Sequence, residues 1–218
     1  MTIVGVDPGR VDEFVAAQRE LSALDGEAGV PWRSVSRTAV FGDTYRFVVM
    51  TPLANFARFD AAADADPARA AIISRIRGVI TSRTTYALRT TPGLDNPLPD
   101  DVEPSLTIVQ VVSVASGREQ DYLRVMAEDV LPHFREAEMH HTSGALTFGG
   151  ESGYVHFFHV PDFAALDQGS PLARALGAQG AQGVLRKLSG VVRRSEQWLV
   201  RYLPGVSFGP EPQAEDRP

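Results

Sequence analysis

The sequence predicts an α+β protein built from two successive β-α-β-β-α-β units whose antiparallel sheets face each other. Three observations lead to this prediction. The chain repeats its own motifs in the same order, each copy alternates strand-like and helix-like hydrophobic patterns, and each copy has too few helices to cover both faces of its sheet.

The repeat is visible as paired motifs along the 218-residue chain. VDPGRVDEFVAA (6–17) corresponds to VASGREQDYLRV (114–125), and IRGVITSRTTYALRTTPGL (76–94) corresponds to LSGVVRRSEQWLVRYLPGV (188–206). Self-similarity of this length indicates a tandem duplication. Other matched positions are Phe14 with Tyr122, Phe41 with Phe148, Tyr45 with Tyr154, Pro52 with Pro161, and Tyr86 with Trp198.

Each copy has the same predicted order of elements. A first strand, TIVGV or LTIVQVVSV, precedes a helix with apolar residues at helical spacing, and two strands follow around a glycine turn. The second helix begins at Asp66-Pro67 or Ser170-Pro171, because a capping side chain followed by proline is typical of a helix start. The last strand is TTYALRT or EQWLVRY. This order is ferredoxin-like.

The repeats define the predicted domains. Residues 1–94 form the first repeat, 95–104 a linker rich in proline and acid, 105–208 the second repeat, and 209–218 a disordered tail. A unit of this kind leaves one apolar sheet face bare, and two such faces in one chain are buried most simply against each other. The expected result is an eight-stranded barrel with helices outside.

Several motifs resemble the dimeric α/β-barrel superfamily, and most of all its antibiotic-biosynthesis-monooxygenase and NIPSNAP-like branches. They are the Gly-Arg before the first helix, the FGG turn, YVHFFHVPDFAALD and SPLARALG. The resemblance covers nearly the whole chain. It implies the barrel fold and a small, apolar or aromatic ligand, with activities that include cofactor-free oxygenation and isomerisation. Fold alone does not choose among them.

Composition limits the classes of function. The net charge is −6 with no basic block, which argues against a nucleic-acid partner, and there is no cysteine for a disulfide, a thiolate metal site or a nucleophile. No apolar run approaches the roughly 18 residues of a membrane span, and the N-terminus is too soon polar for a signal peptide. A soluble cytoplasmic protein, monomer or homodimer, is expected.

The stretch GYVHFFHV (153–160) carries the main candidate site. Side chains alternate along a strand, so His156 shares a face with Tyr154 and Phe158, while His159 lies on the opposite face, and the two cannot ligate one ion. The superfamily resemblance places the His156 face towards the barrel interior. We therefore predict His156 as a general base assisted by Tyr154, with no cofactor and no metal.

The predicted ligand-binding residues surround this strand. Phe47 stands in the first copy where His156 stands in the second, so the position tolerates an apolar residue. Glu196 is the acid expected nearest His156, although it can equally lie at the rim in water. The full set is Phe158, Trp198, Phe47 and Glu196.

Three alternatives stay open at this stage. A core histidine often only bonds a neighbouring hydroxyl or carbonyl, in which case the protein is a non-catalytic binding or scaffold protein of the same fold. His140 and His141 lead into a strand and could contribute to a two-histidine metal site, or form a solvated turn. His133 resembles the helix-borne histidine of haem-binding members, and haem binding is the remaining alternative.

Overall fold

The computed structural model describes residues 1–60, 66–91, 93–99, 102 and 104–209. By its contacts the chain divides into two units, Met1–Thr85 with Arg201–Pro218, and Tyr86–Val200. The predicted tail, apart from Gly209, lies outside the described residues, and the predicted repeat boundaries stay a prediction.

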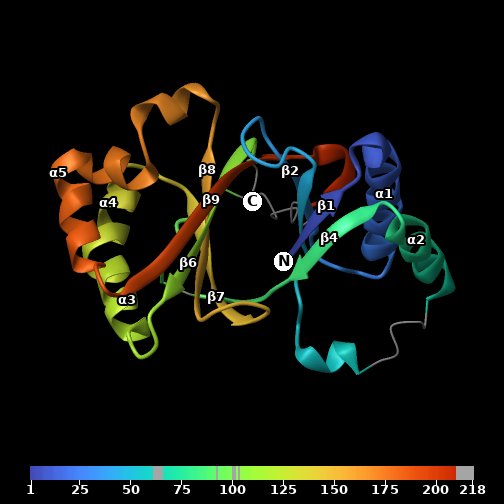
Figure 1. Cartoon of the computed structure of the whole chain (residues 1–218), viewed down its shortest axis with the longest axis horizontal. Helices are drawn as coiled ribbons and strands as arrows, with labels where there is room; N and C mark the ends of the chain where they lie inside the picture. The colour runs from blue at the N-terminus through green and yellow to red at the C-terminus, as the bar shows by residue number, and fades with distance from the viewer. Residues whose placement is uncertain (61–65, 92, 100–101, 103, 210–218) are drawn as a thin grey trace, which may run out of the picture. The chain divides into compact units, whose positions relative to one another are not determined.

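The first unit has the order β-α-β-β-α-β. Its antiparallel strands are arranged β4-β1-β3-β2. Figure 1 shows the two helices together on one face of the sheet. The elements are β1 (Thr2–Val6), α1 (Val11–Glu27), β2 (Ser34–Thr38), β3 (Arg46–Met50), α2 (Pro67–Arg77) and β4 (Ile80–Thr85), with 3₁₀ turns at Pro8–Arg10, Phe56–Phe59 and Pro204–Val206.

The second unit has the same order with one additional strand. Its strands are arranged β9-β6-β8-β7-β5, and its helices again lie together (Figure 1). The elements are β5 (Ala87–Thr90), β6 (Leu106–Val114), α3 (Glu119–Val125), a π-helical turn (Met126–Val130), α4 (Leu131–Glu136), β7 (His141–Phe148), β8 (Gly153–Val160), a 3₁₀ turn (Ala164–Gln168), α5 (Pro171–Lys187) and β9 (Val192–Tyr202).

The two predicted proline helix starts are confirmed. The carboxylate of Asp66 accepts hydrogen bonds from the backbone N–H groups of Ala68 and Arg69, and the hydroxyl of Ser170 accepts one from Ala173. Both caps satisfy amides that the first helical turn leaves without partners.

The predicted single strand at residues 84–90 is wrong. The chain forms two strands on either side of Tyr86, and they have different partners: β4 pairs with β1, and β5 pairs with β7. The hydrophobic pattern shows no break at this point, because both parts are strands and differ only in the strand that each one pairs with.

A π-helical turn widens the helix between α3 and α4. The backbone N–H of Leu131 bonds the carbonyl of Met126, five residues earlier. Pro132 follows directly, and in a regular helix its ring would clash with the carbonyl of Glu128, while its nitrogen has no hydrogen to donate. The wider turn accommodates the proline, as π-bulges commonly do at local irregularities.

Each unit has its own apolar core between its sheet and its helices. The first unit buries Phe14 and Ile76 from its helices against Val4, Val35 and Phe47 from its strands. The second buries helix residues such as Tyr122 and Phe134 against Tyr154 and Phe158 of β8. The face of β8 that carries Tyr154 and Phe158 is therefore the one that the helices cover.

In the described parts of the chain, no helix is both long and apolar enough to cross a membrane.

Candidate functional site

His156 lies inside the helix-covered core of the second unit. Its side chain is 1% exposed, and the strand register places it opposite Ser143 on β7. Tyr122 reaches it from α3. Side chains from a helix and two strands therefore meet around one imidazole.

Both ring nitrogens of His156 have hydroxyl partners. The Tyr122 hydroxyl lies 2.6 Å from Nε2, and the Ser143 hydroxyl lies 2.8 Å from Nδ1. The Ser143 hydroxyl also donates, at 3.5 Å, to the carbonyl of Leu94. One assignment of protons satisfies every group: Tyr122 donates to Nε2, Nδ1–H donates to Ser143, and Ser143 donates to Leu94.

The same carbonyl ends a second arm of this network. His141 is 1% exposed, and its Nε2 lies 2.8 Å from the Leu94 oxygen, which only accepts, so Nε2 of His141 carries the hydrogen. The His141 ring also stacks on Phe158, with centroids 5.5 Å apart. Leu94, the last residue of the predicted first repeat, is thus joined to two residues of β7 by buried hydrogen bonds.

The electrostatics keep this cluster neutral. Burial, and to a smaller degree the imidazole of His141, lowers the pKa of His156 to about 3. Burial is also the main cause that lowers the pKa of His141 and raises the pKa of Tyr122. A neutral imidazole between two hydroxyls meets the rule that buried polar groups have hydrogen-bond partners.

The predicted match of Phe47 with His156 was wrong. The strand register pairs Phe47 with Val4 and Tyr154 with Val112, and these two valines lie equally far before the Gly-Arg of their units, so Phe47 takes the place of Tyr154. Phe47 is 0% exposed and contacts Phe14 of α1 with ring centroids 4.7 Å apart, as Tyr154 stacks on Tyr122 at 4.8 Å. Phe47 is therefore a core residue of the first unit.

The predicted orientation of the His156 face was wrong. Tyr154, His156 and Phe158 point towards the helices: Tyr154 stacks on Tyr122, and Phe158 packs edge-on against Phe134 of α4. The physical reason is that β8 is apolar on both faces, so alternation separates the two sets of side chains without showing which set the helices cover. The catalytic role assigned to His156 and Tyr154 stays a prediction.

The other two predicted binding residues lie on β9. Glu196 is exposed and pairs with Arg194 on the same strand. Trp198 is half-buried on β9. The expected carboxylate partner of His156 is therefore replaced by two hydroxyls, from Tyr122 and Ser143.

The opposite face of β8 carries His159. Val155 and Phe157 share this face and are 0% and 7% exposed. The Nδ1 of His159 lies 3.2 Å from the hydroxyl of Thr107, its direct partner on β6. Burial, and then the imidazoles of His140 and His141, lowers the pKa of His159 to about 4. A neutral, partly accessible imidazole thus lies on the sheet face without helices.

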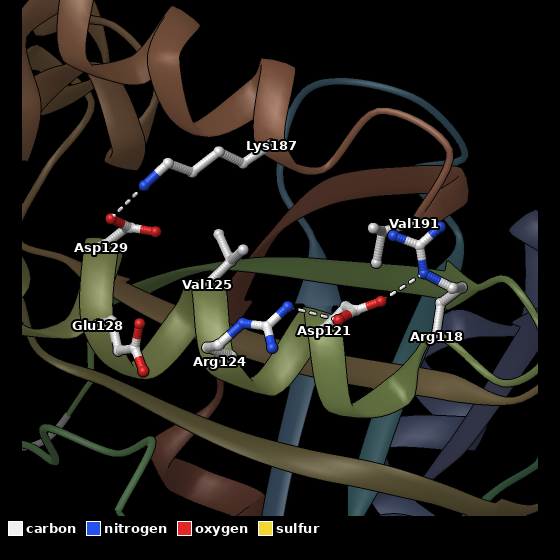
Figure 2. A pocket seen from close by; sticks show the side chains of 8 residues that line it. All are labelled: Arg118, Asp121, Arg124, Val125, Glu128, Asp129, Lys187 and Val191. Carbon is white, nitrogen blue, oxygen red and sulfur yellow. Dashed lines mark hydrogen bonds and ion pairs between the residues drawn. The ribbon is translucent and has the colours of Figure 1, made fainter.

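A separate hollow of about 310 Å³ opens on the surface of the second unit (Figure 2). Its charged side chains largely compensate one another: Arg118 and Arg124 both bond Asp121, and Lys187 bonds Asp129. Exposed pairs of this kind contribute little and are screened by salt. Glu128 also lines the hollow and takes part in no ion pair found among the described residues, and a single exposed carboxylate does not define a ligand site.

The described residues do not fit a haem held by His133. Its side chain on α4 is 48% exposed and lies 3.8 Å from Glu136 on the same helix. The core beneath α4 is filled by Phe134, which contacts His141 and Phe158. Among the described residues there is also no group of three or more histidine and acidic side chains placed to hold a metal ion.

Sequence reasoning missed Tyr122, Ser143 and Thr107. Tyr122 stands at an aromatic position of the first helix in both copies, where it matches Phe14, but the sequence does not show which strand residue such a side chain contacts. Ser143 and Thr107 depend on strand register, which the sequence does not set at single-residue precision.

Comparisons with known proteins support the fold. A candidate monooxygenase from Lactobacillus acidophilus matches with a TM-score of 0.61 and 10% identity, over 92% of this chain and 91% of that one. A candidate monooxygenase from Fusobacterium nucleatum matches with a TM-score of 0.63 and 9% identity, over 95% of each chain. An anthrone oxidase-like protein matches with a TM-score of 0.61 and 11% identity, over 93% and 89%.

These proteins share the dimeric α+β barrel fold, and this chain is a mixed α+β protein that matches them in fold. No family model and no curated protein matches the sequence. At such low identities the likeness is one of fold, and the function has to be argued from the residues.

Proposed function

We propose that this protein is a small-molecule-binding enzyme that removes a proton from an acidic carbon of a flat, largely apolar substrate, with His159 as the base. Cofactor-free oxygenation and isomerisation both begin with this step. The reaction class rests on analogy of fold, and the choice of base rests on the position of His159. We further propose two tandem ferredoxin-like repeats with facing sheets, in a monomer or homodimer.

The observation that carries the proposal is the contrast between the two β8 histidines. Both nitrogens of His156 are hydrogen-bonded in a sealed core, whereas His159 has a described partner only at Nδ1. With its pKa near 4, His159 is neutral at pH 7 and its free lone pair can accept a proton. An enolate formed next to the ring would in turn stabilise the imidazolium.

The surroundings of His159 suit an apolar ligand. Val109, Val155 and Phe157 lie on the same sheet face and provide hydrocarbon beside the polar pair of His159 and Thr107. A mainly apolar surface with a few placed polar groups is the usual composition of a small-molecule site.

A second candidate function is a non-catalytic binding or scaffold protein. It is favoured by the His156 network, in which both ring nitrogens have hydroxyl partners inside the core of the second unit. Catalysis and scaffolding differ in whether a substrate reaches His159.

Anthrone is a suitable probe, because one structural relative is an anthrone oxidase-like protein. Removal of a methylene proton gives a carbanion that reacts with O₂, and one anthrone and one O₂ yield one anthraquinone and one water. We expect the protein to accelerate this conversion in air, and His159→Met to reduce the rate by about 10²-fold or more, the usual contribution of a general base. Anthraquinone absorbance and O₂ uptake provide two readouts.

Two control variants make the result decisive. His156→Phe removes both ring nitrogens from the core and should keep the rate close to that of the original protein, and His133→Gln changes an exposed histidine on α4. Loss of activity in His156→Phe with normal activity in His159→Met would reverse the assignment. No acceleration of oxidation, and no exchange of the methylene protons in D₂O, would favour the scaffold.

A further inference from the structure

His140 and His159 lie side by side on neighbouring segments of the second unit. The antiparallel register pairs His141 with Phe158, and the backbone N–H of His159 donates to the carbonyl of His140 at 3.0 Å. The register therefore continues by one pair, which places His140 opposite His159. Directly opposite residues have Cβ atoms about 4.5–5.5 Å apart and point to one face.

This face is not the one that holds the buried network. His141 stacks on Phe158 within the helix-covered core. Because side chains alternate along each strand, His140 and His159, which are next to that pair, lie on the other face. The imidazole of His140 is also close enough to that of His159 to lower its pKa. Two imidazoles thus neighbour each other outside the core.

The hydrogen bonds at Nδ1 leave Nε2 of each ring available. The Nδ1 of His140 lies 2.9 Å from the carbonyl oxygen of Pro97, which can only accept, so Nδ1 carries the hydrogen and Nε2 of the neutral ring carries a lone pair. The Thr107 hydroxyl can accept a hydrogen bond from Nδ1 of His159, and in that tautomer Nε2 of His159 also carries a lone pair. No described residue lies within hydrogen-bonding distance of either Nε2.

We propose that His140 and His159 together bind one first-row divalent transition-metal ion through their Nε2 atoms. Imidazole is a preferred ligand for zinc, copper and nickel. A ligating histidine almost always donates its other N–H to a carbonyl or a similar group, as His140 does to Pro97, and this contact fixes the ring for coordination.

The site is open. The described residues offer no third histidine or carboxylate that would complete it, so water or an oxygen of a small ligand occupies the remaining positions. With only two protein ligands, the order of affinity follows the general series, with Cu²⁺ above Ni²⁺ and Ni²⁺ above Co²⁺.

This inference goes beyond the proposed function. A bound metal occupies the same lone pair of His159 that would accept the substrate's proton, so the two roles exclude each other at any one time. Because metal affinity is measured without substrate, the metal proposal can fail while the proposed function holds, and the reverse.

The test is a calorimetric titration of the chelator-treated full chain, without an added histidine tag, with NiCl₂ at pH 7.5. We expect one ion per chain, and at least a tenfold loss of affinity in both His140→Gln and His159→Met. His133→Gln should bind like the unchanged protein. CuCl₂ should bind more tightly than NiCl₂, and CoCl₂ less tightly.

Thermal melts without metal show whether each variant is folded. A folded His140→Gln or His159→Met with unchanged Ni²⁺ affinity would overturn the proposal, as would loss of binding in His133→Gln. If the unchanged protein binds no Ni²⁺ at millimolar concentration, the two lone pairs do not converge and the proposal is wrong.

Discussion

Replacing Asp25 with asparagine is expected to lower the free energy of unfolding by about 3–5 kcal/mol, the usual cost of breaking a buried ion pair. The Asp25 carboxylate bonds Arg33 and Arg69, each at 2.6 Å, and Arg33 is almost fully buried. Arg33 also bonds Gln18, while its Nε has no partner among the described residues. Without the carboxylate, a buried guanidinium loses its counter-charge.

Urea unfolding followed by circular dichroism measures this effect. Asp12→Asn is the matched control, because Asp12 is an exposed acid on the same helix. It should change the free energy by no more than about 0.5 kcal/mol, as surface substitutions usually do. A loss below about 1 kcal/mol in Asp25→Asn would show that water reaches the Arg33 site.

Acidification is expected to destabilise the protein through His156. The pKa of this imidazole is about 3 in the folded chain, against 6.5 for an ordinary histidine. Below pH 6.5 the unfolded chain binds a proton that the folded chain does not, so stability is complete above pH 6.5 and falls as the pH approaches 3. The limiting loss is on the order of 5 kcal/mol.

His156→Phe isolates this contribution. Carboxylates also titrate in this range, but they contribute equally to both proteins and cancel in the difference between their unfolding free energies. The unfolding free energy of the unchanged protein minus that of His156→Phe should fall steadily as the pH drops from 7 to 4. A difference independent of pH would mean that His156 accepts a proton without loss of the fold.

Local signals made much of the fold predictable. The helix starts at Pro67 and Pro171 and the two glycine turns depend on neighbouring residues only, so the order of elements could be derived from sequence. The change of partner at Tyr86 could not, because pairing depends on distant strands.

The candidate site shows the same limit. Alternation correctly separates His156 from His159, but which face the helices cover depends on the packing of α3 and α4. The packing of Phe14 on Phe47 in the first unit recurs as the packing of Tyr122 on Tyr154 in the second, but neither contact is visible in the sequence.

The central claim is that the two histidines of β8 differ in access, with the ring of His156 sealed and that of His159 reachable. Histidine ring protons, observed by NMR with a neutral gadolinium chelate in solution, test it without any substrate. We expect strong line broadening for His159 and His140 and little for His156, which is 1% exposed. Broadening of His156 together with protection of His159 would contradict it.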